Sequence, residues 1–352
     1  MSNQVLFNEL PRPTFRWLQV NHTEGQVWGD RTAVAPIVVD AKAGIVSPIA
    51  NSQPLKPAYA GANKSVLDAV MNATGDSYAI KVPAGAKESV KVAIKVEASH
   101  TQADARFLVE AGKDSQVEIL FYLAGNTKEA STVQLFTEVA AQEGAKVTIK
   151  KVQLLGDKVQ HIEHRYTRYA DKADVTYLNV EVGSAESYLN YEQDLKGLEA
   201  SVKHDLAYIG GDEQKFDIAM LMTHEAKKSY SDIHTLGALS GKSKKSFRGT
   251  LDFLKGSSGS EGAEEDTCLL LDPTVHSVSL PLLLCKEDDV VGNHAAGAGQ
   301  IDQTKLFYLM SRGFSETEAK HMIVESMIRP VIDRIGDEAI EEEALAAVRA
   351  KI

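Results

Sequence analysis

Histidine and cysteine are the residue types in this sequence that could bind a metal or a metal cluster. The 352 residues include ten histidines but only two cysteines, Cys268 and Cys285. Two thiolates do not complete a structural zinc or iron–sulfur site, which usually takes about four protein ligands. Each cysteine adjoins a run of leucines, so we expect buried, inert thiols with a raised pKa.

Most of the histidines are predicted to have structural or surface roles. His161 and His164 are three residues apart, which on a strand places them on opposite faces and makes them a weak chelating pair. His204, His224 and His234 fall in different predicted strands or corners, so they could meet only if the strand register brought them together.

The sequence contains no motif that indicates an enzyme. Residues 241–243 (GKS) lack the upstream glycine of a phosphate-binding loop. We find neither a dinucleotide-binding fingerprint nor a nucleophile elbow. Glu264, Glu265 and Asp266 could bind a hard cation, but we expect them to form a solvated loop.

His294 lies in an unusual segment of the chain. Glycines and alanines surround it in residues 288–302 (DDVVGNHAAGAGQID), where predicted strands give way to predicted helices. On physical grounds alone, small residues at such a junction indicate tight backbone packing around a structural histidine.

Charge and composition exclude several classes of protein. There are 38 basic and 49 acidic residues, a net charge of −11, which disfavours nucleic-acid binding and anionic membrane surfaces. No apolar run approaches the ~18 residues of a membrane helix. The first residues lack the basic start of a secretory signal. We therefore expect a cytoplasmic protein with reduced thiols.

The middle of the chain alternates apolar and polar residues with a period of two, which indicates strands with one buried face. Clear examples are Val90, Val92, Ile94 and Val96. Predicted strands start at residues 90, 117, 133, 147, 175, 202, 216 and 247, and most intervals are near 14 or twice 14. This repeat favours a right-handed parallel β-helix, a β-solenoid with two strands per coil. A β-sandwich is the alternative.

Different patterns flank this predicted core. Residues 1–75 hold six of the ten prolines and are predicted to be irregular, apart from a short helix over residues 65–72. Residues 294–352 are predicted to form a helical domain with helices over residues 303–313, from a capping box at Ser315, and over 337–350. Pro330 is expected to bend or break the middle helix. The predicted β-helix therefore covers residues 76–293.

Several segments resemble the SufB/SufD family of iron–sulfur cluster assembly scaffold proteins, and the SufD branch more closely. They are residues 294–302 (HAAGAGQID), 306–313 (LFYLMSRG), 318–319 (EA), 329–331 (RPV) and, upstream, 247–249 (FRG). The resemblance implies a scaffold with no ATPase activity that works with a SufB-type paralogue and a SufC-type ABC ATPase. It also implies that the C-terminal helices dock the ATPase. The candidate docking residues are Leu306, Phe307, Tyr308, Arg312, Met322 and Arg329.

The resemblance makes His294 a candidate ligand of a nascent iron–sulfur cluster. Some SufD relatives have a cysteine two residues earlier, where this chain has Gly292. A chain with two cysteines cannot hold a cluster alone, so we expect a transient cluster shared with a partner and no stable cofactor of its own. The sequence leaves the involvement of a flavin open.

Further alternatives concern partners and activity. Coil edges over residues 275–284 could pair with another chain, which makes a homodimer a second possible assembly. The rival functions are a β-helix enzyme acting on carbohydrate and a purely structural interaction protein.

Overall fold

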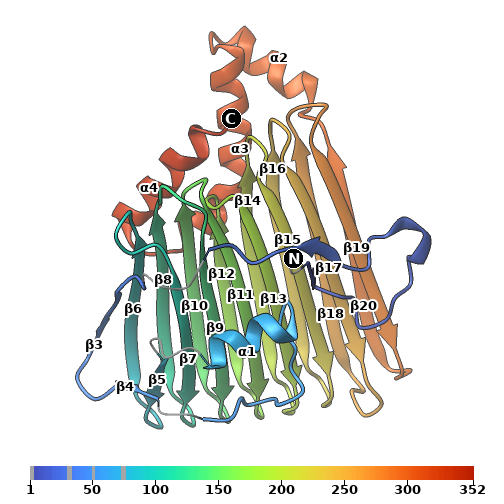
Figure 1. The fold of residues 1–352 in the computed structure, drawn as a ribbon. Helices are drawn as coiled ribbons and strands as arrows, with labels where there is room; N and C mark the ends of the chain where they lie inside the picture. Colours follow the sequence, from blue (N-terminus) through green and yellow to red (C-terminus); the bar gives the residue numbers. More distant parts are fainter. Residues whose placement is uncertain (1–3, 30–33, 50–51, 73–76) are drawn as a thin grey trace.

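The structure is a computed structural model that describes residues 4–29, 34–49, 52–72 and 77–352, and it is dominated by two nine-stranded sheets (Figure 1). From β5 onward, strands that follow one another in the chain alternate between the two sheets. From the N-terminal edge, one sheet contains β3 (Ile37–Ala41), β6 (Lys87–Val96), β8 (Gln116–Gly125), β10 (Lys146–Leu155), β12 (Asp174–Glu181), β14 (Ser201–Gly210), β16 (Tyr230–Leu239), β18 (Ser260–Leu270) and β20 (Val290–Gly299). The other contains β4 (Val46–Pro48), β5 (Ser77–Val82), β7 (Ala103–Ala111), β9 (Ser131–Ala141), β11 (Val159–Tyr169), β13 (Glu186–Leu195), β15 (Lys215–His224), β17 (Lys244–Phe253) and β19 (His276–Cys285).

The strand pairing confirms the parallel β-helix. From β5 and β6 onward every ladder in the two sheets is parallel, and each strand pairs with the strand two places along the chain. Val147 lies beside Val175, and Val175 beside Val202, so these coils repeat after 28 and 27 residues. The alternative prediction of a β-sandwich is wrong, because a β-sandwich has antiparallel sheets.

The alternating residues fill the space between the two sheets, here called the lumen. Its apolar core includes Val92, Phe107, Ile119, Ile149 and Met220, all buried. Weakly patterned segments near residues 161, 187 and 230 are full strands, β11, β13 and β16. Polar residues on the lumen face weaken the apolar–polar alternation of these segments.

The N-terminal residues close one end of the β-helix and cover one sheet. Strands β3 and β4 pair in antiparallel fashion with β6 and β5. A two-stranded ladder joins β1 (Val5–Phe7) and β2 (Thr23–Gly25), and a 3-10 helix, η1, covers Arg16–Leu18. The predicted short helix is confirmed as α1 (Lys64–Asn72), which lies against β7 and β9 (Figure 1).

Three helices follow the last coil: α2 (Gln303–Ser311), α3 (Glu316–Ile332) and α4 (Glu338–Arg349). Two of them, α3 and α4, cover the sheet that contains β6 and β20. Helix α3 contacts β12, β14 and β16, and α4 contacts β10 (Figure 1). The interface between these helices and the sheet buries Val152, Val180, Ile328 and Val348, among others. The predicted capping box forms at Ser315 and Glu318.

Two boundaries differ from the expectation. Helix α3 runs through Pro330 to Ile332, because the proline lies in the last turn and costs only the hydrogen bond to the carbonyl of exposed Ser326. Strand β20 continues to Gly299, so the coils extend six residues past the expected end at residue 293. Among the described residues, no helix is long and apolar enough to cross a bilayer.

Candidate functional site

The two ends of the β-helix differ in how they are closed. The N-terminal coil is covered by antiparallel β3 and β4, whereas β19 and β20 are the outermost strands of their sheets at the other end. Most residues of β20 are exposed. The last coil therefore presents free strand edges and part of its lumen face to the surroundings.

His294 lies in the middle of β20, within the last coil rather than at a strand–helix junction. It pairs with Glu264 of β18 in the parallel ladder. Its orientation follows from Gly292, where a Cβ atom would lie 2.8 Å from Leu283 Cδ1 of the opposite sheet. Residues two apart on a strand share a face, so His294 belongs to the lumen face, yet it is exposed because no further coil covers it.

Glu264 has a buried carboxyl group that none of the described residues binds. Glu264 is 3 % exposed, and neither oxygen of its carboxyl group has a hydrogen-bond partner among the described residues. Burial raises its pKa to about 8, and the nearby charge of Asp266 adds to the shift. The expectation of a solvated acidic loop is wrong, because residues 264–266 lie inside β18 and alternate buried, exposed, buried.

Asp266, two residues further along, is fully engaged. Its carboxylate forms a buried ion pair with Lys245 and accepts hydrogen bonds from Ser279 Oγ and, at 2.6 Å, from Thr235 Oγ1. The charge of Asp266 is thus balanced, whereas no group in the described part of the chain forms a hydrogen bond with the Glu264 carboxyl group.

The two cysteines have different environments. Cys268 is buried as predicted, and burial raises the pKa of its thiol. The prediction for Cys285 is wrong: this residue is exposed, and its Sγ lies 3.1 Å from the carbonyl oxygen of Glu287. Cys285 ends β19, and its leucine neighbours would bury it only if another coil covered the last one.

A second group of polar residues lies sealed in the lumen between β10 and β14. Lys151 forms ion pairs with Glu163 and Glu181, and its Nζ is 2.9 Å from Tyr191 Oη. Arg165 pairs with Glu163 at 2.5 Å. Burial alone would raise the pKa of Glu163, but the charges of Arg165 and Lys151 hold it well below its usual range. Two cations therefore balance two carboxylates.

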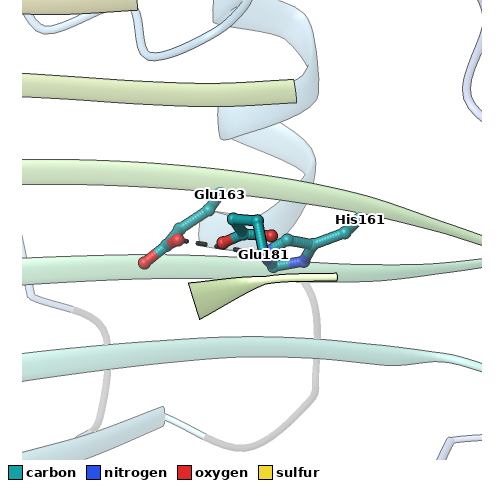
Figure 2. Close-up of side chains that lie close together, drawn as sticks. All are labelled: His161, Glu163 and Glu181. Carbon is teal, nitrogen blue, oxygen red and sulfur yellow. Dashed lines mark ion pairs between the residues drawn. The ribbon is translucent and has the colours of Figure 1, made fainter. Parts of the chain in front are cut away.

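Within this group His161, Glu163 and Glu181 have donor atoms within 4.8 Å of one another, as in a metal site (Figure 2). The chemistry of the surroundings does not fit a metal, because the Lys151 ammonium group already pairs with both carboxylates. We therefore assign these residues to a charge-balanced core.

The remaining histidines have the expected structural or surface roles. His161 and His164 lie on opposite faces of β11, and His164 Nδ1 accepts a hydrogen bond from the amide of Ala62 at 3.0 Å. His224 is buried between two serine hydroxyl groups. His234 is half-buried and pairs with Glu265. His204 is buried, and burial with the charge of Arg165 lowers its pKa well below the usual range.

The predicted docking residues divide into two groups. Phe307 is 74 % and Tyr308 56 % exposed, and Arg312 lies over the Tyr308 ring at 5.1 Å. Met322 and Arg329 are also exposed. Leu306 is buried with Ile301 and Ala319, so it holds α2 in place and is not part of the exposed surface. Exposed Met310 and Phe314 extend this apolar surface and were not singled out from the sequence.

Sequence reasoning missed Glu264 and the Lys151 group as buried polar sites. A signal exists: each of these charged residues occupies a lumen position in the period-two pattern of its strand. Arg165 and Glu163 share β11, but Lys151 and Glu181 lie on other strands, so the coil register is needed to show that the charges are balanced.

The molecule is thus a parallel β-helix with one capped and one open end, and a histidine on the lumen face of the open coil. Residues 94–327, more than half of the chain, match the family described as SUF system FeS cluster assembly, SufBD core domain. The chain belongs to this family of iron–sulfur cluster assembly proteins.

Curated relatives agree with the family match. The SufD protein of Bacillus subtilis is 28% identical over 144 residues, which cover 41% of this chain and 33% of SufD. The SufB protein of the same organism is 24% identical over 263 residues, covering 73% and 56%. A SufBD family protein of Mycobacterium tuberculosis is 26% identical over 204 residues, covering 58% and 24%. The matched region spans less than two thirds of each of these relatives.

Proposed function

We infer that this chain is a cytoplasmic, SufD-like scaffold subunit without ATPase activity of its own. In this proposal it pairs with a SufB-type paralogue and a SufC-type ATPase, and the complex builds and transfers nascent clusters. The observation that carries the proposal is the exposed imidazole of His294 on the lumen face of an open terminal coil, in a member of the SufBD family.

The open coil is suited to pair with a similar coil of another subunit. Strand β20 (VVGNHAAGAG) has no Lys, Arg, Asp, Glu or Pro, the residues that normally protect an edge strand from pairing. Val291 of β20 and Leu283 of β19 are exposed and supply apolar surface. A partner strand added here would continue the sheets and bring its own side chains to His294.

A shared site explains how a chain with so few thiols could take part in cluster assembly. Imidazole nitrogen is a suitable iron ligand, and the remaining ligands would come from cysteines of the partner. Cys285 is the one thiol of this chain exposed at the same end. The cluster is cargo in this scheme and not a resident cofactor.

The ATPase would dock on a second exposed apolar surface, formed by Phe307, Tyr308, Met310 and Phe314 around α2 and by Met322 on α3. Aromatic and methionine side chains with an arginine nearby are typical of interface centres. Helix α3 packs on β12, β14 and β16, so force or motion at this surface can reach the β-helix.

Co-expression with a SufB-type and a SufC-type subunit, followed by anaerobic purification, tests the proposal. We expect a three-protein complex that contains iron and sulfide. A complex without either would support a purely structural role, and a stable homodimer that excludes the SufB-type subunit would contradict the proposed pairing. Glycan cleavage without complex formation would support the carbohydrate-active alternative, which gains nothing from the family match.

A further inference from the structure

The unpartnered carboxyl group of Glu264 is the strongest unexplained feature of the described residues. A buried carboxyl group with no donor or cation is costly, and such groups are rare in folded proteins. Its neighbour Asp266 shows how this lumen normally treats a carboxylate, with one ammonium group and two hydroxyl donors. Glu264 has none of these partners.

A glycine on the opposite sheet leaves space for the Glu264 carboxyl group. This carboxyl group lies against Gly249 of β17, where a Cβ atom would overlap it. The preceding residue, Arg248, points away from the lumen and pairs with Asp217 at 2.8 Å, so it does not neutralise Glu264. Gly249 thus leaves space for the Glu264 carboxyl group, and the ion pair of Arg248 with Asp217 keeps the Arg248 guanidinium group on the other face of β17.

The next coil places His294 directly beside Glu264. The two residues are partners in the parallel β18–β20 ladder, where neighbouring strands are about 4.8 Å apart. Both belong to the lumen face, as the contact of Gly292 with Leu283 shows for β20. Glu264 is buried and His294 is exposed on the outermost strand, so His294 lies one coil nearer the open end than Glu264.

We propose that Glu264 and His294 together bind a divalent cation at the open end of the lumen, through a carboxylate oxygen and a ring nitrogen. Carboxylate and imidazole are ligands that suit Fe(II), Mn(II), Co(II) and Zn(II). Water or a partner subunit would complete the coordination. The identification of the natural cation as ferrous iron, before it enters a cluster, rests on the proposed function.

Titration of the isolated chain with Co(II), followed by its visible absorption bands, tests this site without partner subunits. We expect Glu264→Gln and His294→Ala each to weaken Co(II) binding by at least tenfold. Glu265→Gln is the matched control, because Glu265 adjoins Glu264 in β18 but is exposed and faces outward. It should leave the affinity unchanged.

A second readout does not depend on the variants. Bound Co(II) should broaden the imidazole NMR signals of His294 and leave those of His276, an exposed histidine at the start of β19, sharp. Wild-type Co(II) affinity in Glu264→Gln, or unbroadened His294 signals, would overturn the inference. Neither result bears on complex formation, so failure of this site and failure of the proposed function are distinguishable.

Discussion

Lys151 and Glu163 form an ion pair inside the β-helix, where their side chains are 0 % and 2 % exposed. Glu181 completes the arrangement from the neighbouring strand. Buried ions are tolerated only when their charges are matched, and here each ion has its match on another strand. This contrasts with Glu264, nearer the open end, whose carboxyl group has no partner.

Removal of Lys151 should therefore be strongly destabilising. We expect Lys151→Met to lower the free energy of unfolding by about 3–5 kcal/mol, because two carboxylates lose their shared cation. Urea denaturation measures the loss. Lys146→Met is the control, since Lys146 is exposed at the start of the same strand, β10. A loss below ~1 kcal/mol for Lys151→Met would show that the ion pair does not hold the coils together.

His224 should make the protein sensitive to acid. Burial lowers its pKa from 6.5 to about 4, so the folded protein keeps the ring neutral while the unfolded chain takes up a proton near pH 6.5. The neutral His224 ring therefore contributes its full stabilisation above pH 6.5, and this contribution is lost as the pH falls toward 4. We expect His224 to contribute a loss of roughly 2 kcal/mol between pH 7.5 and 5.

Urea unfolding of His224→Gln at both pH values isolates this contribution. The variant starts less stable, since two serine hydrogen bonds change, but its stability should fall less on acidification than that of the wild type. Urea unfolding of His234→Gln, at a half-buried position on the outer face of β16, provides the comparison. Equal acid losses in His224→Gln and wild type would refute the assignment.

The docking surface can be tested without disturbing the fold. Phe307→Ser with Met322→Ser should weaken binding to a SufC-type ATPase by at least tenfold, because aromatic residues at interface centres carry much of the binding energy. Surface plasmon resonance gives the affinity. Both side chains are exposed, so we expect the free energy of unfolding to change by less than about 0.5 kcal/mol.

Leu306→Ala should affect stability rather than ATPase binding, the opposite of the double variant. Leu306 is buried under α2, so its truncation should cost roughly 2–3 kcal/mol of stability and change ATPase binding little once the protein is folded. Unchanged ATPase affinity in the double variant would move the docking site elsewhere. Deletion of residues 303–352 is a poorer test, because it would remove α3 and α4 and expose Val152 and Val180, which these helices cover.

Local sequence patterns were sufficient to predict the coils and the helices. Residues such as Val117 and Ile119 alternate because one face of each strand fills the lumen, and that alternation survives without knowledge of the neighbours. Capping residues are equally local: Asp302, Ser315 and Asp337 each accept a hydrogen bond from the first turn of the helix that follows.

Features that depend on contacts between coils were not predictable in the same way. Cys285 has leucine neighbours in the sequence, yet it is exposed because no coil covers the last one. Glu264 has acidic neighbours and resembles a surface loop, yet β17 and β20 bury it. Leu306 is a candidate docking residue in the sequence, and in the structure it is buried against Ile301 and Ala319.

The most direct test of the account is the iron and sulfide content of the anaerobically purified three-protein complex carrying His294→Ala. We predict an intact complex with at least fivefold less iron and sulfide than wild type, while His276→Ala, an exposed histidine of β19, retains both. An intact His294→Ala complex with wild-type iron and sulfide would contradict a role for the open coil in cluster assembly.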